Sequence, residues 1–357
     1  MSGADRRFSL ESLQRWTGGV LRTAGVNADD AAQTARMLIQ ADARGFRTHG
    51  LTRLPSYVEK LESGEFNPQA TLDEIFVASF GIVEANRALG QIAGPFAVDR
   101  AVRRTAHSPV AVYILRDTGH LGALGTIVLP AAQAGRVAVI FQATPPVIGL
   151  PGATGPMLGN NPLALAAPRP DGPPIVVDIA CSVAARGNIL MAARAGNTIP
   201  EGWALDDAGQ PTTDASRALV GTLLAFGGHK GLMISVIGEV LAGSLSGRGF
   251  QDSLNPNGRV GSAAGSLNAF LLVINPELTT GQHAYEAHLT DWITHFKANG
   301  GPDVRLPGER AAQAEQQACE LGVPFGDGVA DALRALGQSR GVPFPDPTSA
   351  TQAGARH

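Results

Sequence analysis

Val110–Gly125 reads VAVYILRDTGHLGALG. Its first six residues are apolar and mostly β-branched or aromatic, which predicts a strand over Val110–Leu115. The strand leads into a turn in which Gly119, Gly122 and Gly125 stand three residues apart, and a helical stretch follows. A Rossmann fold would instead place G-x-G-x-x-G after its first strand, and that fingerprint is absent from the chain. The stretch therefore predicts a strand-to-helix turn that is not the one a Rossmann fold requires.

The regions on either side of this stretch differ in character. Towards the N-terminus, apolar residues at helical spacing predict helices over Ser9–Ala24, Ala28–Arg47 and Leu54–Ser63. Towards the C-terminus, helices are predicted over Gly281–Asn299, Gly308–Leu321 and Gly328–Arg340. The predicted strands between them include Ile75–Ser79, Val137–Gln142, Leu163–Ala167, Ile175–Asp178 and Leu267–Ile274. We therefore predict a helical layer built from residues 1–72 and 281–342, a mixed α/β region over 73–280 and a flexible tail over 343–357.

The composition is that of a globular protein, with 44% hydrophobic and 17% charged residues in a chain of 357. A net charge of −3 creates no field that would attract nucleic acid, so we expect no nucleic-acid partner. The N-terminus lacks the apolar segment of a signal peptide, and no apolar run is long enough to span a bilayer. We therefore expect a cytoplasmic protein with no membrane partner. Cys181 and Cys319 provide neither a disulfide framework nor a zinc-binding set, and Cys181 is expected to be a packed residue.

Two sequence patterns resemble a nucleophile motif and a metal-binding motif, and we predict neither role for them. Residues 337–341 read GQSRG, which matches the letters of a hydrolase nucleophile elbow, but they end a predicted helix and no strand leads into them. His283, His288 and His295 lie on one predicted helix at spacings of five and seven residues, not at the spacing of four that a metal needs on a helical face. We expect surface or packing roles for these histidines and predict no metal site.

The stretch Thr48–Tyr57, THGLTRLPSY, is the first candidate site. His49 could serve as a general acid or base at neutral pH, and the planar guanidinium of Arg53 matches the geometry of a carboxylate. A capping threonine, a satisfied histidine and a surface arginine explain the same letters. On local sequence alone, that structural explanation is about twice as common as the functional one.

Three other segments could hold an anion or a cofactor. His120 lies in the glycine-rich turn after the predicted strand Val110–Leu115, where main-chain N–H groups can face an anion. Gly227–Gly231, GGHKG, precedes an apolar helix, so the helix N-terminus and Lys230 would both favour a phosphate. Asp178 ends a buried strand, where a carboxylate needs partners. A plain strand-to-helix loop and a tight left-handed turn explain the first two segments equally well, so both explanations remain open.

Taken together and in order, these segments resemble the type-2 malate/L-lactate dehydrogenase family, which includes ureidoglycolate and sulfolactate dehydrogenases and Δ1-piperideine-2-carboxylate reductase. Further segments that carry the resemblance are Ala41–Gly45 (ADARG), Ile199–Asp206 (IPEGWALD), Pro211–Asp214 (PTTD) and Leu306–Arg310 (LPGER). The resemblance covers nearly the whole chain, from Asp42 to Arg340. No single segment is specific, but the ordered set is.

The resemblance implies a fold in which a helical layer built from both chain ends joins a non-Rossmann, mixed-sheet cofactor domain. The cofactor part would cover residues 116–225. An NAD(P)H cofactor, a small carboxylate substrate and a homodimer are also implied. The residues that the resemblance assigns to the cofactor site are His120, Leu121, Gly122, Ala123, Leu124, Asp178, Ile179, Ala180, His229, Lys230, Gly308, Glu309 and Arg310.

The resemblance also implies roles in catalysis and substrate binding. The residues concerned are Thr48, His49, Arg53, Tyr57, His120, Asn160 and Asn188. By resemblance His49 is the proton donor or acceptor, and Arg53 binds the substrate carboxylate with help from Asn160. In some members of the family the histidine that matches His120 is named as the proton-transfer residue, so the choice between the two histidines stays open.

Three residues depart from the family's pattern. Thr48 replaces the serine that usually supports the histidine, and Asn160 stands where a threonine is usual. Asn188 falls where a lysine is expected, or an aspartate that completes a Ser-His-Asp relay in the imine reductase. An amide can orient an imidazole but cannot stabilise its cation as a carboxylate does. The departure at Asn188 therefore puts the relay and the substrate class in question.

We expect an oxidoreductase that transfers a hydride between nicotinamide and C2 of a small 2-oxo acid or 2-hydroxy acid. An alternative is NAD(P)H-dependent reduction of a cyclic or N-substituted 2-imino acid to an amino acid, because His229 before Lys230 resembles the imine-reducing branch. A hypothesis of another class is an inactive member that only binds the dinucleotide. The presence of His49, Arg53 and Lys230 counts against that hypothesis.

Overall fold

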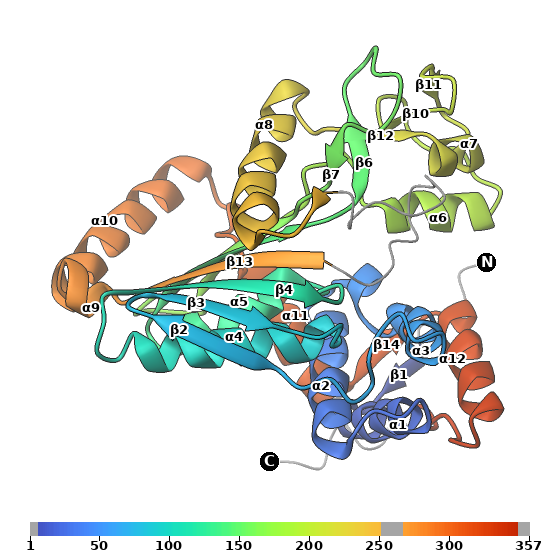
Figure 1. Ribbon diagram of the computed structural model, residues 1–357, viewed down its shortest axis with the longest axis horizontal. Helices are drawn as coiled ribbons and strands as arrows, with labels where there is room; N and C mark the ends of the chain where they lie inside the picture. The colour runs from blue at the N-terminus through green and yellow to red at the C-terminus, as the bar shows by residue number, and fades with distance from the viewer. Residues whose placement is uncertain (1–5, 251–266, 349–357) are drawn as a thin grey trace.

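The computed structural model describes residues 6–250 and 267–348. A seven-stranded sheet of order β2-β3-β4-β13-β5-β8-β9 forms the centre of the molecule (Figure 1). Its strands are β2 (Asp73–Val77), β3 (Phe80–Glu84), β4 (Val110–Thr118), β5 (Val137–Ala143), β8 (Leu163–Ala167), β9 (Ile175–Ile179) and β13 (Leu267–Ile274). Strands β3 and β4 run parallel, and the other neighbouring pairs run antiparallel. This mixed sheet confirms the predicted α/β class and differs from the all-parallel sheet of a Rossmann fold.

Helical elements cover both faces of the large sheet. They are α4 (Gly90–Arg104), α5 (Leu124–Gln133) and the π-helical turn η3 (Glu239–Gly243). Tyr113 and Leu115 of β4 are fully buried in the cluster formed with α4 and α5. Ile114, between them, packs in the cluster of Phe141 and Ala242, on the side of η3. Because both faces are covered, β4 is apolar at consecutive positions, which explains the uninterrupted run in the sequence.

A smaller sheet of order β11-β10-β12-β6-β7 forms a second core. Its strands are β6 (Pro146–Gly149), β7 (Leu158–Gly159), β10 (Ala204–Leu205), β11 (Pro211–Thr212) and β12 (Thr222–Leu224). The helices around it are α6 (Arg186–Arg194), α7 (Ala215–Val220) and α8 (His229–Gly238). Ile148, Ile189, Leu223 and Leu232 are buried together in this core. The two sheets are contiguous in the chain, since β6 follows β5 after two residues.

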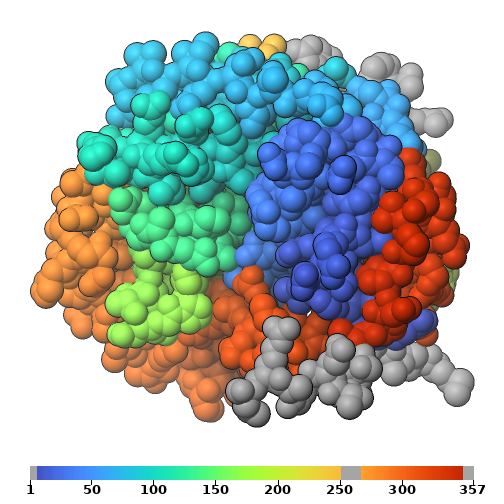
Figure 2. Space-filling model, turned by 90° about the horizontal axis from the view of Figure 1, so that it is seen from below, coloured from blue at the N-terminus to red at the C-terminus, as the bar shows by residue number. Residues whose placement is uncertain are grey.

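The two ends of the chain build a third layer. Its elements are β1 (Arg6–Phe8), α1 (Leu10–Thr23), α2 (Ala28–Ala43), the 3-10 turns η1 (Arg47–His49) and η2 (Leu51–Arg53), α3 (Leu54–Glu62), α11 (Glu309–Leu321), β14 (Val323–Phe325) and α12 (Asp327–Ser339). Strand β1 pairs with β14 in antiparallel register, with Phe8 opposite Val323. Figure 2 shows the N-terminal helices, in blue, directly beside the C-terminal segment, in red.

The structure differs from the prediction in two segments, helix α10 and the start of the C-terminal tail. Helix α10 (Gln282–Gly300), which follows the short α9 (Pro276–Thr279), does not join the terminal layer but lies at the opposite side of the large sheet from α1 and α12 (Figure 1). None of its residues is buried within the part of the chain that the structure describes. The predicted tail is packed over residues 343–348: the ring of Phe344 lies 4.8 Å from that of Trp16. Residues 349–357 of the predicted tail lie outside the described residues.

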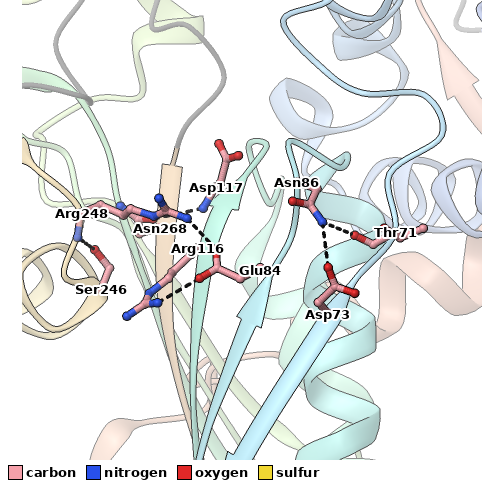
Figure 3. Close-up of polar contacts among 9 residues, drawn as sticks. All are labelled: Thr71, Asp73, Glu84, Asn86, Arg116, Asp117, Ser246, Arg248 and Asn268. Carbon is pink, nitrogen blue, oxygen red and sulfur yellow. Dashed lines mark hydrogen bonds and ion pairs between the residues drawn. The ribbon is translucent and has the colours of Figure 1, made fainter.

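A polar cluster ties distant segments to the ends of the parallel strands (Figure 3). Glu84, at the end of β3, accepts hydrogen bonds from Arg116 of β4 at 2.9 Å and from Arg248 at 2.6 Å. Asn268 of β13 accepts a hydrogen bond from the main-chain N–H of Asp117 at 3.2 Å. The end of the segment that follows η3 and the start of β13 are therefore both held at the carboxyl ends of β3 and β4.

Candidate active site

The turns η1 and η2 are held by a buried carboxylate of α2. Asp42 is 1% exposed, and its Oδ2 accepts a hydrogen bond from the main-chain N–H of Leu51 at 2.7 Å. A Cβ at Gly50, between the two turns, would collide with the same carboxylate, so this position needs glycine. Burial raises the pKa of Asp42 to about 7, against the opposing effects of the Leu51 N–H and the charge of Arg47. The carboxyl group thereby fixes the turn that separates His49 from the Arg53 side chain.

His49 lies at the end of η1 and is uncharged at neutral pH. Its Nδ1 is 2.9 Å from Oγ1 of Thr48, so the threonine hydroxyl, which stands where the family's pattern has a serine, contacts the imidazole. Arg53 donates from Nε to the main-chain oxygen of Thr48 at 2.7 Å. Burial, with a smaller contribution from the charge of Arg53, lowers the pKa of His49 to about 4. The imidazole is therefore neutral beside a guanidinium.

His120, from the turn between β4 and α5, completes a cluster with the first stretch. Its ring is stacked on that of His49, with centroids 5.6 Å apart and an interplanar angle of 23°. Tyr57 of α3 brings its Oη to 2.9 Å from His120 Nδ1. Burial, then the positive charge of Arg53, holds the pKa of His120 well below its usual range. The structure thus brings together four of the residues named from the sequence: His49, Arg53, Tyr57 and His120.

Two buried glutamines hold His120, and neither was predicted from the sequence. Gln91 of α4 donates from Nε2 to Tyr57 Oη at 3.2 Å and to the main-chain oxygen of His120 at 3.3 Å. Gln142 of β5 donates from Nε2 to the main-chain oxygen of Gly119 at 3.0 Å and accepts from the main-chain N–H of Leu121 at 3.1 Å. A polar residue inside the apolar run of β5 was the one available signal, because buried polar groups need partners.

The two asparagines that depart from the family's pattern have different environments. Asn160 uses its side-chain Oδ1 to accept the main-chain N–H of Ser182 at 2.8 Å, so its amide holds two chain segments together. The start of α6 approaches the first stretch: a Cβ at Gly187 would lie 3.1 Å from Cγ2 of Thr48. Asn188, one residue further along, is exposed, and its side chain makes no hydrogen bond to either histidine within the described residues. The structure does not bring Asn188 into a histidine relay.

The turn after β4, the end of β9 and the start of α11 meet at one place. Asp178 of β9 accepts the main-chain N–H of Gly125 at 2.7 Å, at the start of α5. Burial raises the pKa of Asp178 to about 6, opposed by that hydrogen bond. A Cβ at Gly308, whose φ is +96°, would lie 2.9 Å from the main-chain nitrogen of Val176 in the same strand. Three of the segments assigned to a cofactor by resemblance are therefore neighbours.

The start of α8 offers main-chain donors. Gly227 and Gly228 have φ of +56° and +63°, and His229 and Lys230, both exposed, begin the helix. Among the residues that the structure describes, no side chain caps the helix, so its first N–H groups and the ammonium of Lys230 fit a diphosphate. Among the remaining assigned residues, the carboxylate of Glu309 is held by Arg169 at 2.7 Å and Lys297 at 3.2 Å, so it serves the protein's own structure.

Other sequence-based expectations concern groups outside this cluster. Burial raises the pKa of the Cys181 thiol to about 11, as expected for a packed cysteine. His283, His288 and His295 of α10 are exposed. Over residues 6–250 and 267–348, no three His, Cys, Asp or Glu side chains gather as a metal site. Within the same residues, no helix is both long and apolar enough to cross a bilayer.

Known proteins resemble the chain along nearly its whole length. The sequence profile described as malate/L-lactate dehydrogenase matches residues 8–334. A Δ1-pyrroline-2-carboxylate reductase of Ancylobacter novellus is 34% identical over 93% of this chain and 97% of its own length. A (2R)-3-sulfolactate dehydrogenase (NADP+) of Chromohalobacter salexigens is 33% identical over 94% of this chain and 99% of its own length.

A solved structure supports the same grouping. The δ1-piperideine-2-carboxylate reductase of Pseudomonas syringae pv. tomato superposes with a TM-score of 0.83 and 30% sequence identity, covering 92% of this chain and 99% of that one. The shared architecture includes the mixed sheets, and the family profile spans both the histidine cluster and the segments around Asp178. The chain belongs to the malate/L-lactate dehydrogenase family.

Proposed function

We propose that this protein is an NAD(P)-dependent oxidoreductase that transfers a hydride between nicotinamide and C2 of a small 2-oxo acid or 2-hydroxy acid. Membership of the family supports the reaction type, and the sulfolactate dehydrogenase relative acts on a compound of this class. The observation that carries the proposal is a stacked pair of neutral imidazoles, His49 and His120, beside the guanidinium of Arg53.

Each side chain of the cluster has a distinct task in this reaction. The Nε of Arg53 donates a hydrogen bond to the main-chain oxygen of Thr48, and the two terminal nitrogens are left to hold the substrate carboxylate. In the reducing direction, the imidazole that transfers the proton takes one from solvent and gives it to the substrate oxygen; in the oxidising direction it accepts the proton from the substrate and releases it to solvent. NAD(P)H supplies the hydride when bound. The start of α8, with Lys230, would hold its diphosphate.

The charges around the two histidines favour an oxygen substrate over a protonated imine. Burial is the main cause that lowers the pKa of both histidines, and the positive charge of Arg53 lowers both further. A positive field stabilises the negative charge that develops on a carbonyl oxygen during reduction and destabilises a cationic iminium. Reduction of a cyclic 2-imino acid is the second candidate, supported by the 34% identity to the pyrroline-2-carboxylate reductase.

Substrate panels separate these candidates. NADH and NADPH oxidation is measured by absorbance with small 2-oxo acids, with and without methylamine, and with Δ1-piperideine-2-carboxylate. Turnover of an oxo acid without amine supports the proposal, whereas turnover restricted to the imine or to the amine mixtures favours the second candidate. Cofactor binding without any turnover would support an inactive, dinucleotide-binding protein.

Variants of the two histidines test the catalytic cluster. We expect His49→Gln and His120→Gln to lower kcat, by about 10²–10⁴-fold for the one that transfers the proton. His107→Gln, at an exposed position, is the matched control and keeps wild-type kcat. Unchanged kcat in both cluster variants would contradict the assignment of proton transfer to this pair.

We also infer that the protein is a homodimer, with α8 in the interface. Met233 and Ile237 of α8 and Val240 of η3 are 51–52% exposed. A helix that is apolar on its solvent side as well as on its core side is normally covered, and a second copy of the chain is the partner that the family resemblance implies. Light scattering after size-exclusion chromatography should give a dimer, and Ile237→Lys should shift it to a monomer, whereas Gln338→Lys on α12 should not. A wild-type monomer would refute the inference.

A cytoplasmic location accords with the two free cysteines and is tested by cell fractionation.

A further inference from the structure

The orientation of the Gln91 amide is fixed by its neighbours. Its Nε2 lies 3.3 Å from the main-chain oxygen of His120. A main-chain oxygen can only accept a hydrogen bond, so the Gln91 atom that faces it must be the amide nitrogen, which carries two protons. One proton serves His120 O, and the other is available to Tyr57 Oη at 3.2 Å. Gln91 is 2% exposed, which excludes bulk water as an alternative partner.

The direction of the next hydrogen bond follows from the first. Tyr57 is 3% exposed, and its Oη has two partners in the described chain, Gln91 Nε2 and His120 Nδ1. Because Oη accepts from Gln91, its own proton has one place left to go, the lone pair of His120 Nδ1 at 2.9 Å. The reverse direction would leave a buried phenolic O–H without an acceptor, which native structures avoid. Nδ1 is therefore the acceptor nitrogen of His120.

We propose that Gln91 is a positioning residue that acts through Tyr57 to hold His120 in the tautomer with its proton on Nε2, so that His120 presents a neutral N–H donor to the oxygen on C2 of the substrate. This role deepens the proposed function and rests on it. Nε2 has no hydrogen-bond partner among the described residues, so its proton remains available to the substrate. Gln142 supports the same arrangement, since it holds the main chain on both sides of His120 at Gly119 and Leu121.

Nitrogen NMR of histidine-labelled protein reads the tautomer without any turnover. The signals of His120 are those lost in His120→Asn. We expect a protonated, pyrrole-type Nε2 and an unprotonated, pyridine-type Nδ1 in the wild-type protein at neutral pH. A wild-type spectrum with the proton on Nδ1 would overturn the proposal. This result needs no substrate, so it is independent of the panel of acids and imines. Absence of turnover would contradict the proposed reaction but would leave the tautomer measurement valid.

The variant Gln91→Glu is designed to reverse the direction of the hydrogen bonds that join position 91, Tyr57 and His120. An ionised glutamate carries no proton and can only accept from Tyr57, so His120 then donates from Nδ1 and loses its proton at Nε2. We expect the NMR signals of the two nitrogens to exchange character and kcat to fall by about 10²–10⁴-fold, as for a misplaced acid–base group, with little change in the KM for NAD(P)H. Gln338→Glu, the same change at an exposed site of α12, should alter neither.

A second variant guards against an effect on folding alone. Tyr57→Phe keeps the ring and removes the hydroxyl, so His120 Nδ1 loses its donor while Gln91 keeps its bond to the main-chain oxygen. We expect a mixture of tautomers and a smaller loss of kcat than in Gln91→Glu. An unchanged tautomer in both variants would show that Gln91 and Tyr57 do not set it.

Discussion

Arg53 combines two roles in one side chain, because its Nε holds the main chain at Thr48 while its terminal nitrogens are available to a carboxylate. A lysine keeps the charge but cannot serve both partners. Arg53→Lys should therefore raise the KM for the 2-oxo acid by roughly 10–10²-fold, as expected for the loss of a charged, partly buried contact. The KM for NAD(P)H should stay unchanged. Steady-state kinetics on both substrates check this, with Arg334→Lys of α12 as control; an unaltered acid KM would contradict carboxylate binding by Arg53.

The raised pKa of Asp42 has a consequence for stability. A carboxyl group whose pKa is about 7 in the folded protein and 3.8 in the unfolded chain loses stabilising effect as the pH rises from about 4 to 7, because the folded state holds the proton more tightly. Asp42→Asn removes this ionisation. Urea unfolding should show the variant gaining stability relative to wild type between pH 5 and pH 8, by up to a few kcal/mol at about 1.4 kcal/mol per pKa unit. Asp331→Asn, at an exposed site, should follow wild type; a parallel pH response of Asp42→Asn would contradict a raised pKa.

The sequence predicted a site residue where its side chain is of a kind rarely found in a protein core. It did not predict a residue whose role depends on a partner far away in the sequence. The imidazole and guanidinium groups of His49, Arg53 and His120 suggested proton transfer and anion binding, local sequence left a structural explanation open, and the resemblance to the family assigned their roles. Gln91 carries no such signal, since its partner His120 lies 29 residues away and on another element. Asn188 shows the converse: its position in the pattern suggested a relay, but the side chain is exposed.

At the scale of elements, the junction between η1 and η2 determines how the cluster is assembled. Any Cβ at Gly50 collides with the Asp42 carboxylate, which belongs to α2 and cannot move without that helix. Gly50→Ala should lower the free energy of unfolding by roughly 1–3 kcal/mol, the usual cost of overpacking. It should also displace His49 and Arg53 together, so kcat falls and the acid KM rises. Gly155→Ala, where a Cβ meets nothing within 4 Å, is the matched control, and equal effects of the two changes would refute this explanation.

The sequence predicted which residues form strands better than it predicted which elements pack against one another. The predicted runs Leu163–Ala167 and Leu267–Ile274 coincide with β8 and β13, because short apolar runs bounded by turn residues are a local signal. The helix of α10 was also predicted, but its place was not: helical periodicity shows that a helix forms and not what it packs against. The three-residue strands β1 and β14 were missed because their pairing joins residues more than 300 positions apart.

At the scale of the whole molecule, the C-terminal segment helps to close the terminal layer. The ring of Phe344 lies 4.8 Å from Trp16 and 5.2 Å from Phe8. Phe344→Ala should therefore lower the free energy of unfolding by roughly 2–4 kcal/mol, near the lower end for a large aromatic residue because Phe344 is only partly buried. Phe80→Ala, at the exposed tip of the β2–β3 hairpin, should change it by much less. Equal melting temperatures for Phe344→Ala and wild type would contradict this role for the tail.

The pairing of β1 with β14 has a consequence for how the chain folds. Arg47, in the turn that carries His49, donates to the main-chain oxygen of Pro324 and lies over the ring of Phe325. The catalytic turn is thus supported by a segment that lies 277 positions away in the sequence. Bringing such distant segments together costs chain entropy, which is offset only when the terminal layer packs. The histidine cluster therefore depends on contacts of high sequence separation, the kind that slows folding.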